Sequence, residues 1–317
     1  MENKRHVFIV NPAAGKDSCL KEMEDFVDSF SASNLRCELE TSLGKGDCER
    51  IAKRICLEAA DEDDHVCFYV CGGDGTLNEV VNGIMHSGQS ERVALTHIPR
   101  GSGNDFIKNF DSIDEKTDLI KFFLVNVRGQ KIDVIKVNDR YCLSICSFGL
   151  DARIGTNIER FRRHWWLNGK RAYIASFLTN IWKGIGRKMT IEFTQEQDDF
   201  SLTQTLSGDW SMVCVANGAF YGGSFHPVPE AKIDDGILDV LFVKKMSTLR
   251  LLFLLSAYKN GDYKKFPKLI RHFSNVTSLR LETDQPEPVN LDGELLMSKD
   301  TEVELIPHCL TFFTPEP

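Results

Sequence analysis

Residues 72–76 (Gly-Gly-Asp-Gly-Thr) combine three glycines with a carboxylate and a hydroxyl, and their neighbours suggest how they are held. An apolar run at residues 66–70 precedes them, and apolar residues at helical spacing follow over residues 77–85, which predicts a strand, a turn and a helix start. Glycines let a backbone approach a ligand closely, and N–H groups at a helix N-terminus attract anions. Asp74 suits such a place if a divalent cation lies between it and the phosphates. We therefore expect a nucleotide-phosphate site with Mg²⁺ nearby.

The start of this helix has a second signal. Thr76 and Glu79 have the spacing of a capping box, with Thr76 as the N-cap residue and Glu79 three residues later. The alternative interpretation of the whole segment is a tight strand–helix turn that binds nothing.

A second glycine-rich loop, residues 99–106 (Pro-Arg-Gly-Ser-Gly-Asn-Asp-Phe), follows an expected strand at 93–98. A third turn, residues 11–16 (Asn-Pro-Ala-Ala-Gly-Lys), follows an expected strand at 6–10 and lacks the spacing of a Walker loop. In open α/β sheets, ligands bind at loops beyond the carboxyl ends of the strands. The three loops are therefore expected to share one edge of a sheet.

The chain resembles the diacylglycerol kinase catalytic-domain family, specifically its soluble bacterial lipid-kinase branch, over nearly its full length. The matching motifs occur in the family's order: residues 11–16, 72–80 (Gly-Gly-Asp-Gly-Thr-Leu-Asn-Glu-Val), 99–106, 216–218 (Ala-Asn-Gly), 221–223 (Tyr-Gly-Gly), 229–236 (Pro-Glu-Ala-Lys-Ile-Asp-Asp-Gly) and 292–294 (Asp-Gly-Glu). NAD kinases share the Gly-Gly-Asp-Gly-Thr core but carry a different second motif. The loop at 99–106 therefore favours a lipid kinase, and Ser102 keeps the hydroxyl of the family's usual threonine.

The resemblance implies transfer of the ATP γ-phosphate to a lipid hydroxyl, with diacylglycerol as the expected acceptor, phosphatidic acid as the product, and ATP and Mg²⁺ as cofactors. The expected nucleotide-binding residues are Asn11, Thr41, Gly72, Gly73, Asp74, Gly75, Thr76, Asn78, Glu79, Ser102 and Asp105. Asp74 and Asp105 are expected to organise the phosphates and Mg²⁺. Other acceptors remain open: a sphingoid base, phosphatidylglycerol or NAD. A catalytically silent nucleotide- or lipid-binding protein is the alternative of another class.

The catalytic assignment also follows from the resemblance. Phosphoryl transfer needs a group that takes the proton from the attacking hydroxyl, and a carboxylate can do this. Glu294 is the candidate general base, and Asp292 is expected to support it, either from behind the reacting groups or through Mg²⁺. Asp74 is the rival base, as in the sphingosine-kinase branch.

The resemblance further implies a structural Mg²⁺ held by the Asp235 carboxylate and by the backbone carbonyls of Lys232 and Ile237. Such oxygen donors suit a hard cation. The alternative interpretation is a plain β-turn, which Asp-Asp-Gly often forms.

The order of expected elements predicts two domains. Strands and helices alternate up to about residue 125, which predicts an α/β domain at 1–126 with a mostly parallel sheet and helices on both faces. Alternating strand patterns then dominate, with a hairpin from 130–137 and 140–148 and one helical pair over 248–273. This predicts a mainly antiparallel β-sandwich at 127–306 that handles the lipid, and residues 307–317 are expected to return to the first domain. The nucleotide is expected in the cleft between the domains, which would also hold the acyl chains.

Composition narrows the class of protein. A hydrophobic content of 42% with 26% charged residues is ordinary for a globular protein, and no run of about 18 apolar residues predicts a membrane span. The N-terminus leads into a strand without a signal-peptide pattern, and the ten cysteines form no Cys-x-x-Cys pair. We expect reduced cysteines and a cytoplasmic protein. A net charge of −8 argues against nucleic-acid binding.

The region from residue 160 to 191 lacks carboxylates and is rich in basic residues and tryptophans, notably Arg162, Arg163, Trp165 and Trp166. This combination suits an anionic membrane surface. We expect peripheral contact with the inner face of the membrane through these four residues; the alternative is a solvated helix with its tryptophans in the core. The resemblance also admits a homodimer, although no residue demands one.

Overall fold

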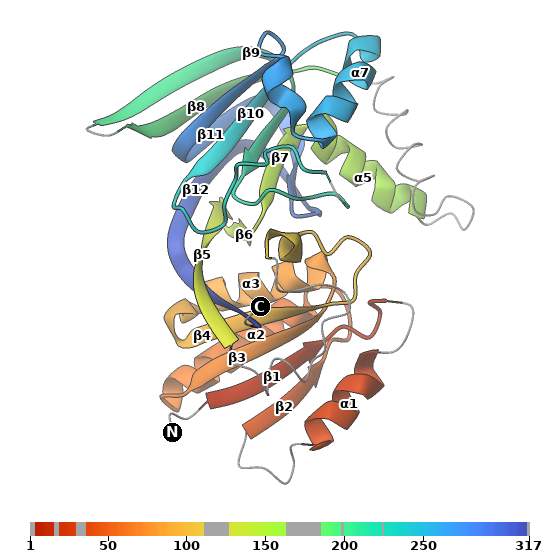
Figure 1. Cartoon of the computed structure of the whole chain (residues 1–317), viewed down its shortest axis with the longest axis vertical. Coiled ribbons are helices and arrows are strands. Elements are labelled where there is room, and N and C mark those ends of the chain that lie inside the picture. The colour runs from red at the N-terminus through yellow and green to blue at the C-terminus, as the bar shows by residue number, and fades with distance from the viewer. Residues whose placement is uncertain are drawn as a thin grey trace. The chain divides into compact units, whose positions relative to one another are not determined.

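The computed structural model describes residues 4–15, 19–29, 36–110, 127–162, 185–197, 200–223 and 225–315 (Figure 1). Its contacts divide the chain into two compact units. The first contains residues up to Val134 together with Pro307–Pro317, and the second contains Ile135–Ile306.

The first unit is built on a parallel sheet. Its strands are β1 (Lys4–Val10), β2 (Arg36–Thr41), β3 (His65–Gly72) and β4 (Val93–Pro99), in the spatial order β2-β1-β3-β4. The end of the long strand β12 (Glu294–Pro315) adds to the sheet in parallel beside β4. Short strands with buried apolar side chains, joined through helices, produce this arrangement.

Helices cover both faces of this sheet (Figure 1). The helix α1 (Cys19–Ser29) packs on one face, where the Phe26 ring lies 5.7 Å from the Phe8 ring and Phe8 stacks on Tyr69 at 4.5 Å. The helices α2 (Asp47–Asp61) and α3 (Asp74–Ser87) lie together on the other face. They are so close that a Cβ atom at Gly83 would lie 2.4 Å from the Glu49 carbonyl oxygen. Two 3-10 turns, η1 (Ser90–Arg92) and η2 (Phe106–Asn109), complete the described part of this unit before β5.

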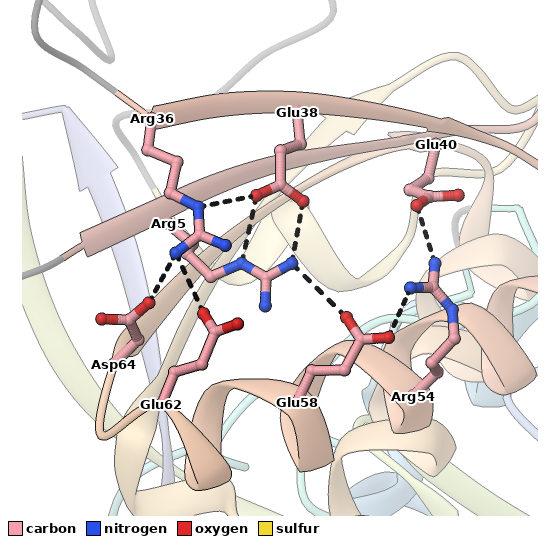
Figure 2. A network of polar contacts seen from close by, with 8 residues as sticks. All are labelled: Arg5, Arg36, Glu38, Glu40, Arg54, Glu58, Glu62 and Asp64. Carbon is pink, nitrogen blue, oxygen red and sulfur yellow. Dashed lines mark hydrogen bonds and ion pairs between the residues drawn. The ribbon is translucent and has the colours of Figure 1, made fainter.

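An ion-pair network fixes β1 and β2 to α2 (Figure 2). At its centre, Arg5 binds Glu38 through two hydrogen bonds of 2.9 and 3.1 Å and lies 3.5 Å from Glu58. The Arg5 side chain is only 5% exposed, so its charge depends on these partners. The other members of the network are Arg36, Glu40, Arg54, Glu62 and Asp64.

The second unit is mainly antiparallel. Its strands are the end of β5 (Val127–Val137), β6 (Arg140–Cys142), β7 (Ile145–Gly149), β8 (Arg187–Gln197), β9 (Phe200–Ala216), β10 (Leu238–Lys244), β11 (Ile270–Leu291) and the first part of β12. The strands β9 and β11 are long enough to pair with β8 along one part and with β7 or β10 along another. They thereby build both layers of a sandwich around buried aromatic side chains such as Phe193 and Phe242.

The described residues of this unit include the helices α5 (Leu150–Arg162) and α7 (Thr248–Lys259). The predicted helical pair over 248–273 is wrong in its second half, because α7 is followed only by the 3-10 turn η3 (Asp262–Lys265) and then by β11. Gly261 has a φ of 72°, which ends α7, and Pro267 disfavours a helix just before it.

Two further sequence-based boundaries differ from the structure. The expected strand at 140–148 is two strands, because Leu143 and Ser144 belong to neither β6 nor β7, and their amides donate to the Asp292 carboxylate. The division between the units falls after Val134 and not after residue 126. The first part of β5 stays with the first unit, where Asp133 accepts a hydrogen bond of 2.7 Å from the His308 amide.

Candidate functional site

The strand register brings the predicted loops to one edge of the parallel sheet. Val10 lies opposite Thr41 on one side and opposite Cys71 on the other, and Gly72 lies opposite Pro99. The loops that follow these strands therefore begin side by side, as loops of an open parallel sheet must. Thr41 itself ends β2 at this edge.

The first loop contacts the glycine loop directly. The Asn11 side-chain amide donates a hydrogen bond of 3.0 Å to Thr76 Oγ1, and the Asn11 backbone amide donates one of 3.0 Å to the Cys71 carbonyl. Asn11 Oδ1 accepts from the Ala13 amide at 3.0 Å, which closes the turn after β1. The structure thus brings Asn11 and Thr76 together.

The glycine loop opens α3 one turn earlier than the capping-box prediction placed it. The helix begins at Asp74 with Gly73 as its N-cap residue, and the Leu77 amide donates the first helical bond, 3.1 Å, to the Gly73 carbonyl. The capping-box interpretation is therefore wrong: Thr76 lies within the first turn. The first N–H groups of a helix have no partner in the helix, so residues 74–76 can offer theirs to an anion.

Glu79 and Asn78 serve helix contacts. Both Glu79 oxygens bind the N-terminus of α2, accepting hydrogen bonds from the Gly46 amide at 2.8 Å and the Cys48 amide at 3.2 Å. Asn78 is buried and bonded to Asn82 within α3. Both residues were predicted to bind nucleotide, and these hydrogen bonds connect their side chains to the helices α2 and α3.

The two glycine loops touch through their backbones. A Cβ atom at Gly101 would lie 2.5 Å from Gly73 Cα, and one at Gly103 would lie 2.8 Å from Asp74 Oδ2. Asn104, at a φ of 48°, holds this loop by hydrogen bonds of 2.9 Å in both directions with the Gly101 backbone. Only glycine fits at such contacts. Ser102 is exposed at the turn of this loop.

Asp74 joins the two loops. Its Oδ1 atom accepts hydrogen bonds from the amides of Asp105 at 2.7 Å and Phe106 at 3.4 Å. Burial and the nearby Asp105 carboxylate raise the pKa of Asp74, against the opposing effect of these amides. Lys108 forms an ion pair of 2.5 Å with Asp105. Two neighbouring carboxylates repel each other, and a divalent cation bound between them would remove this repulsion.

His97 is a supporting residue that sequence reasoning missed. Its Nε2 atom lies 2.9 Å from the Gly72 carbonyl, to which the Arg100 amide also donates at 2.7 Å. Burial lowers the pKa of His97 to about 4, so the ring is neutral near pH 7 and Nε2 must carry the hydrogen to donate. A single histidine in an apolar strand gives no sequence signal for this role.

In the second unit, residues 291–294 form the tight turn between β11 and β12, and Asp292 anchors it. The Asp292 carboxylate accepts hydrogen bonds from the amides of Leu143 at 2.6 Å, Ser144 at 3.1 Å and Ile145 at 2.8 Å. Asp292 has a φ of 51°. Its oxygens are therefore committed to backbone amides, which favours a positioning role for Asp292. Glu294 follows as the first residue of β12 and is half-exposed.

The predicted structural metal loop lies just before β10. Asp235 is exposed, and its Oδ1 atom accepts a hydrogen bond of 3.3 Å from the Ile237 amide. The structure thus brings Asp235 and Ile237 together, and Lys232 lies three residues earlier on the same exposed loop. A carboxylate and backbone carbonyls are donors that fit Mg²⁺ or Ca²⁺. Among the described residues, no cluster of three or more His, Cys, Asp or Glu side chains forms another metal-binding group.

The second unit also contains an apolar pocket that the sequence analysis did not identify. It is partly open to solvent, and the room for a water-sized molecule between its lining atoms is about 30 Å³. Its walls come from α5, α7, β9, β10 and the segment around Tyr221: Leu150, Asp151, Ile154, Ser211, Met212, Tyr221, Phe225, Val243, Leu251, Leu254, Leu255 and Tyr258. Such a lining suits a hydrocarbon chain.

Asp151 is the one carboxylate in this pocket. It accepts a hydrogen bond of 2.5 Å from Ser147 Oγ, and burial raises its pKa. Nearby, the hydroxyls of Tyr221 and Tyr258 are 3.1 Å apart. The only sequence signal for Asp151 is that it is the single acidic residue in the apolar stretch 141–154.

The residues predicted to contact a membrane cannot be placed. Arg163, Trp165 and Trp166 lie outside the described residues, as does the side chain of Arg162. In the parts of the chain that the structure describes, no helix has both the length and the apolarity to span a bilayer.

Comparison with known families agrees with this geometry. Residues 5–137 match the model of the diacylglycerol kinase catalytic domain, and residues 144–314 match that of the YegS C-terminal NAD kinase beta sandwich-like domain. The two models together cover both units described above.

Individual relatives point the same way. A Staphylococcus carnosus protein described as a "putative lipid kinase" is 26% identical over 309 residues, covering 95% of this chain and 94% of its own. A similarly described Staphylococcus epidermidis protein is 29% identical over 296 residues, covering 90% and 88%. A crystal structure titled as a "putative diacylglycerol kinase" from Bacillus anthracis is 25% identical with a TM-score of 0.69, covering 100% of this chain and 98% of its own. The chain therefore belongs to the diacylglycerol kinase catalytic-domain family.

Proposed function

We propose that the protein transfers the γ-phosphate of Mg-ATP to the hydroxyl group of a lipid, and that this lipid is diacylglycerol. The observation that carries the proposal is the junction of the two glycine loops, where Asp74 accepts the Asp105 amide at 2.7 Å beside the N-terminus of α3. Membership in a kinase family supports the reaction class. The choice of diacylglycerol rests on the resemblance and on the description of the first domain.

The loops supply the phosphate-binding groups. The amides of Gly75 and Thr76 at the start of α3 would bind phosphate oxygens, since they lie at the positive end of the helix dipole. Glycines at 72, 73 and 101 let the loops pack closely, since an added Cβ atom would meet Thr76 at 2.4 Å, Gly101 at 3.0 Å and Gly73 at 2.5 Å respectively. Asn11 would orient Thr76 through their hydrogen bond, and Ser102 and Thr41 would contribute hydroxyls.

The carboxylates divide into different roles. Asp74 and Asp105 would hold Mg²⁺, which neutralises charge on the phosphates when bound. Glu294 would accept the proton of the attacking lipid hydroxyl, whose oxygen bonds to the γ-phosphorus as the bond to the ADP oxygen breaks. Asp292 would fix the turn that carries Glu294. Asp235 with the Lys232 and Ile237 carbonyls would hold a structural Mg²⁺ in the second unit.

The apolar pocket supports a lipid acceptor over NAD. Its lining is almost all aliphatic and aromatic, which suits acyl chains and offers few partners for a dinucleotide. NAD stays the second candidate because the second domain model is described by its likeness to the NAD kinase sandwich. Peripheral binding to the inner face of the membrane from the cytoplasm is part of the proposal, since diacylglycerol resides in the bilayer.

The test is transfer of labelled γ-phosphate from Mg-ATP to diacylglycerol in mixed micelles, with sphingosine, phosphatidylglycerol and NAD as parallel acceptors. Asp74→Ala and Glu294→Ala should each abolish labelled phosphatidic acid. Asp63→Ala and Glu302→Ala are matched controls, because their side chains are 86% and 72% exposed in the same respective units. Loss in only one of the first two variants would identify which carboxylate turnover requires.

Two outcomes would overturn the proposal. Label in NAD would replace the lipid acceptor with a dinucleotide. Binding of ATP without transfer to any of these acceptors or to a lipid extract would indicate the silent nucleotide-binding protein instead.

A further inference from the structure

The helix α7 carries two apolar faces. Its inner face lines the apolar pocket of the second unit, through Leu251, Leu254, Leu255 and Tyr258. Its outer face repeats the same i, i+3, i+4 spacing with Leu249, Leu252 and Phe253. A helix that is apolar on opposite faces is unusual at the surface of a protein in water, where one face is normally polar.

The outer face is exposed. Phe253 is 81% exposed, Leu249 is 70% exposed and Leu252 is 45% exposed. They are three of the eight large hydrophobic side chains found exposed in the described residues, and they lie within five positions of one helix. Neighbouring exposed apolar groups of this kind mark a surface that contacts another apolar phase.

The charged residues in α7 and the short segments on either side of it are all basic. Residues 244–261 contain Lys244, Lys245, Arg250 and Lys259 but no aspartate or glutamate, in a chain with 46 acidic residues and a net charge of −8. Arg250 is exposed between the apolar residues of the outer face. One of these cations, Lys245, is paired with Asp209 at 3.2 Å, and Asp262, just after the helix, is paired with Lys265 at 2.8 Å. Within the described part of the chain, Arg250 and Lys259 form no ion pair.

We propose that the outer face of α7 is a docking surface for an anionic lipid bilayer. Leu249, Leu252 and Phe253 would enter the interface between headgroups and acyl chains, while Arg250 and Lys259 would bind lipid phosphates. The same helix walls the pocket with its inner face, so a lipid drawn from the bilayer at α7 would have only the thickness of one helix to pass. The inference rests on the proposed lipid acceptor and names the surface through which that acceptor arrives.

The apolar side chains and the basic residues of this surface together favour an anionic bilayer over a second copy of the chain as its partner. In a symmetric contact between two α7 helices both surfaces would carry Arg250 and Lys259, and like charges oppose such a contact. An anionic bilayer satisfies both the exposed leucines and phenylalanine and the basic residues.

The test is flotation of the whole protein with vesicles, without ATP or diacylglycerol, so that its outcome does not depend on catalysis. Vesicles of phosphatidylcholine with phosphatidylglycerol should carry the wild-type protein, and vesicles of phosphatidylcholine alone should carry less. The double variant Leu249→Ser with Phe253→Ser should partition roughly tenfold or more weakly, because two large apolar side chains are lost from the contact. Arg250→Gln should weaken binding to the phosphatidylglycerol vesicles only, and added salt should do the same.

The matched control is Phe200→Ser with Leu202→Ser, which removes two exposed apolar side chains, 58% and 37% exposed, from the β8–β9 hairpin of the same unit. This control should float as the wild type does. Flotation of the α7 double variant equal to wild type, or no flotation of the wild type, would overturn the inference. So would a wild-type dimer in sedimentation that the α7 variant dissociates, since a second copy would then cover this face.

The two proposals fail separately. If flotation depends on α7 but no phosphate is transferred to any lipid, the proposed function is contradicted and the docking surface is supported. If the docking surface is correct, the α7 double variant should still phosphorylate a short-chain, water-soluble diacylglycerol at the wild-type rate and lose turnover only on long-chain diacylglycerol in vesicles. Equal loss on both substrates would contradict docking.

Discussion

The carboxylate of Asp292 accepts a hydrogen bond of 2.6 Å from the backbone amide of Leu143. Together with the bonds from Ser144 and Ile145, it ties the β11–β12 turn to the segment between β6 and β7. The Asn217 side chain donates to the carbonyl of Leu143 at 2.7 Å and so holds the same segment from another side. Asp292 therefore fixes the backbone from which Glu294 projects two residues later.

Asp292→Ala should lower stability and activity together. Three backbone amides would lose their acceptor, and each buried donor left unpaired costs about 1–3 kcal/mol. We therefore expect the free energy of unfolding to fall by about 3 kcal/mol in total. Urea unfolding would measure this. Glu294→Ala should lose turnover with a smaller change in the unfolding midpoint than Asp292→Ala, which separates the base from its anchor. A change below about 0.5 kcal/mol for Asp292→Ala would contradict the anchoring role.

Glu79→Ala should destabilise α2 without weakening nucleotide binding. Its carboxylate caps the Gly46 and Cys48 amides, and the loss of such a cap costs about 1 kcal/mol. Glu79→Gln keeps one acceptor oxygen and should lose less. Thermal unfolding measures the stability change and calorimetric titration with Mg-ATP measures affinity. A marked loss of ATP affinity in a folded Glu79→Gln protein would instead support the predicted role of Glu79 in nucleotide binding.

Gly101→Ala should abolish nucleotide binding. The added Cβ atom would lie 2.5 Å from Gly73 Cα, so the two glycine loops must separate. Gly44→Ala is the matched control, because a Cβ atom at Gly44 meets nothing within 4 Å. The measurement is the rise in melting temperature on adding Mg-ATP, which should vanish for Gly101→Ala and persist for Gly44→Ala. An undiminished rise in both variants would show that contact between the loops is not required.

Arg5→Ala should destabilise the first unit through the network of Figure 2. Arg5 is nearly buried between Glu38 and Glu58, and its removal leaves Glu38 with only Arg36 at 3.2 Å and Glu58 with only Arg54 at 2.8 Å within this network. Breaking a buried ion pair costs about 3–5 kcal/mol of stability. Because Glu38 is partly exposed, we expect the free energy of unfolding to fall by about 2 kcal/mol. Arg92→Ala breaks the exposed pair with Asp63 and should change stability by less than about 0.5 kcal/mol. Equal urea midpoints for the two variants would refute this difference.

The first unit was largely predictable from sequence because its signals are local. Apolar strands followed by glycine turns indicated a parallel sheet, and residues 72–76 and 99–106 could be assigned to its carboxyl edge. The strand expected at 93–98 is β4, which runs over Val93–Pro99. A local pattern needs only neighbouring residues to be interpreted.

The residues that were missed, and the capping box that was wrong, depend on partners far away in the chain. Glu79 caps a helix 31 and 33 residues earlier, and Asp292 binds amides 147–149 residues away. The spacing of Thr76 and Glu79 suggested a local capping box, but the α2 amides compete for the same carboxylate. Asp151 enters the pocket only because α7 and β9 fold against α5. Tertiary contacts of this kind leave no periodic pattern in sequence.

Asp151→Asn should change how stability depends on pH. Burial raises the Asp151 pKa above its ordinary value of 3.8, so the folded protein holds this proton more tightly than the unfolded chain does. The charged form therefore costs stability: the cost is absent below about pH 3.8, grows as pH rises towards the folded-state pKa, and stays constant above it. Asparagine keeps an acceptor for Ser147 and carries no charge. The difference in unfolding free energy between Asp151→Asn and wild type, from urea unfolding at a series of pH values, should thus move in favour of the variant from about pH 4 upwards. A difference that stays flat, or moves towards the wild type as pH rises, would mean that the Asp151 pKa is not raised in the folded protein.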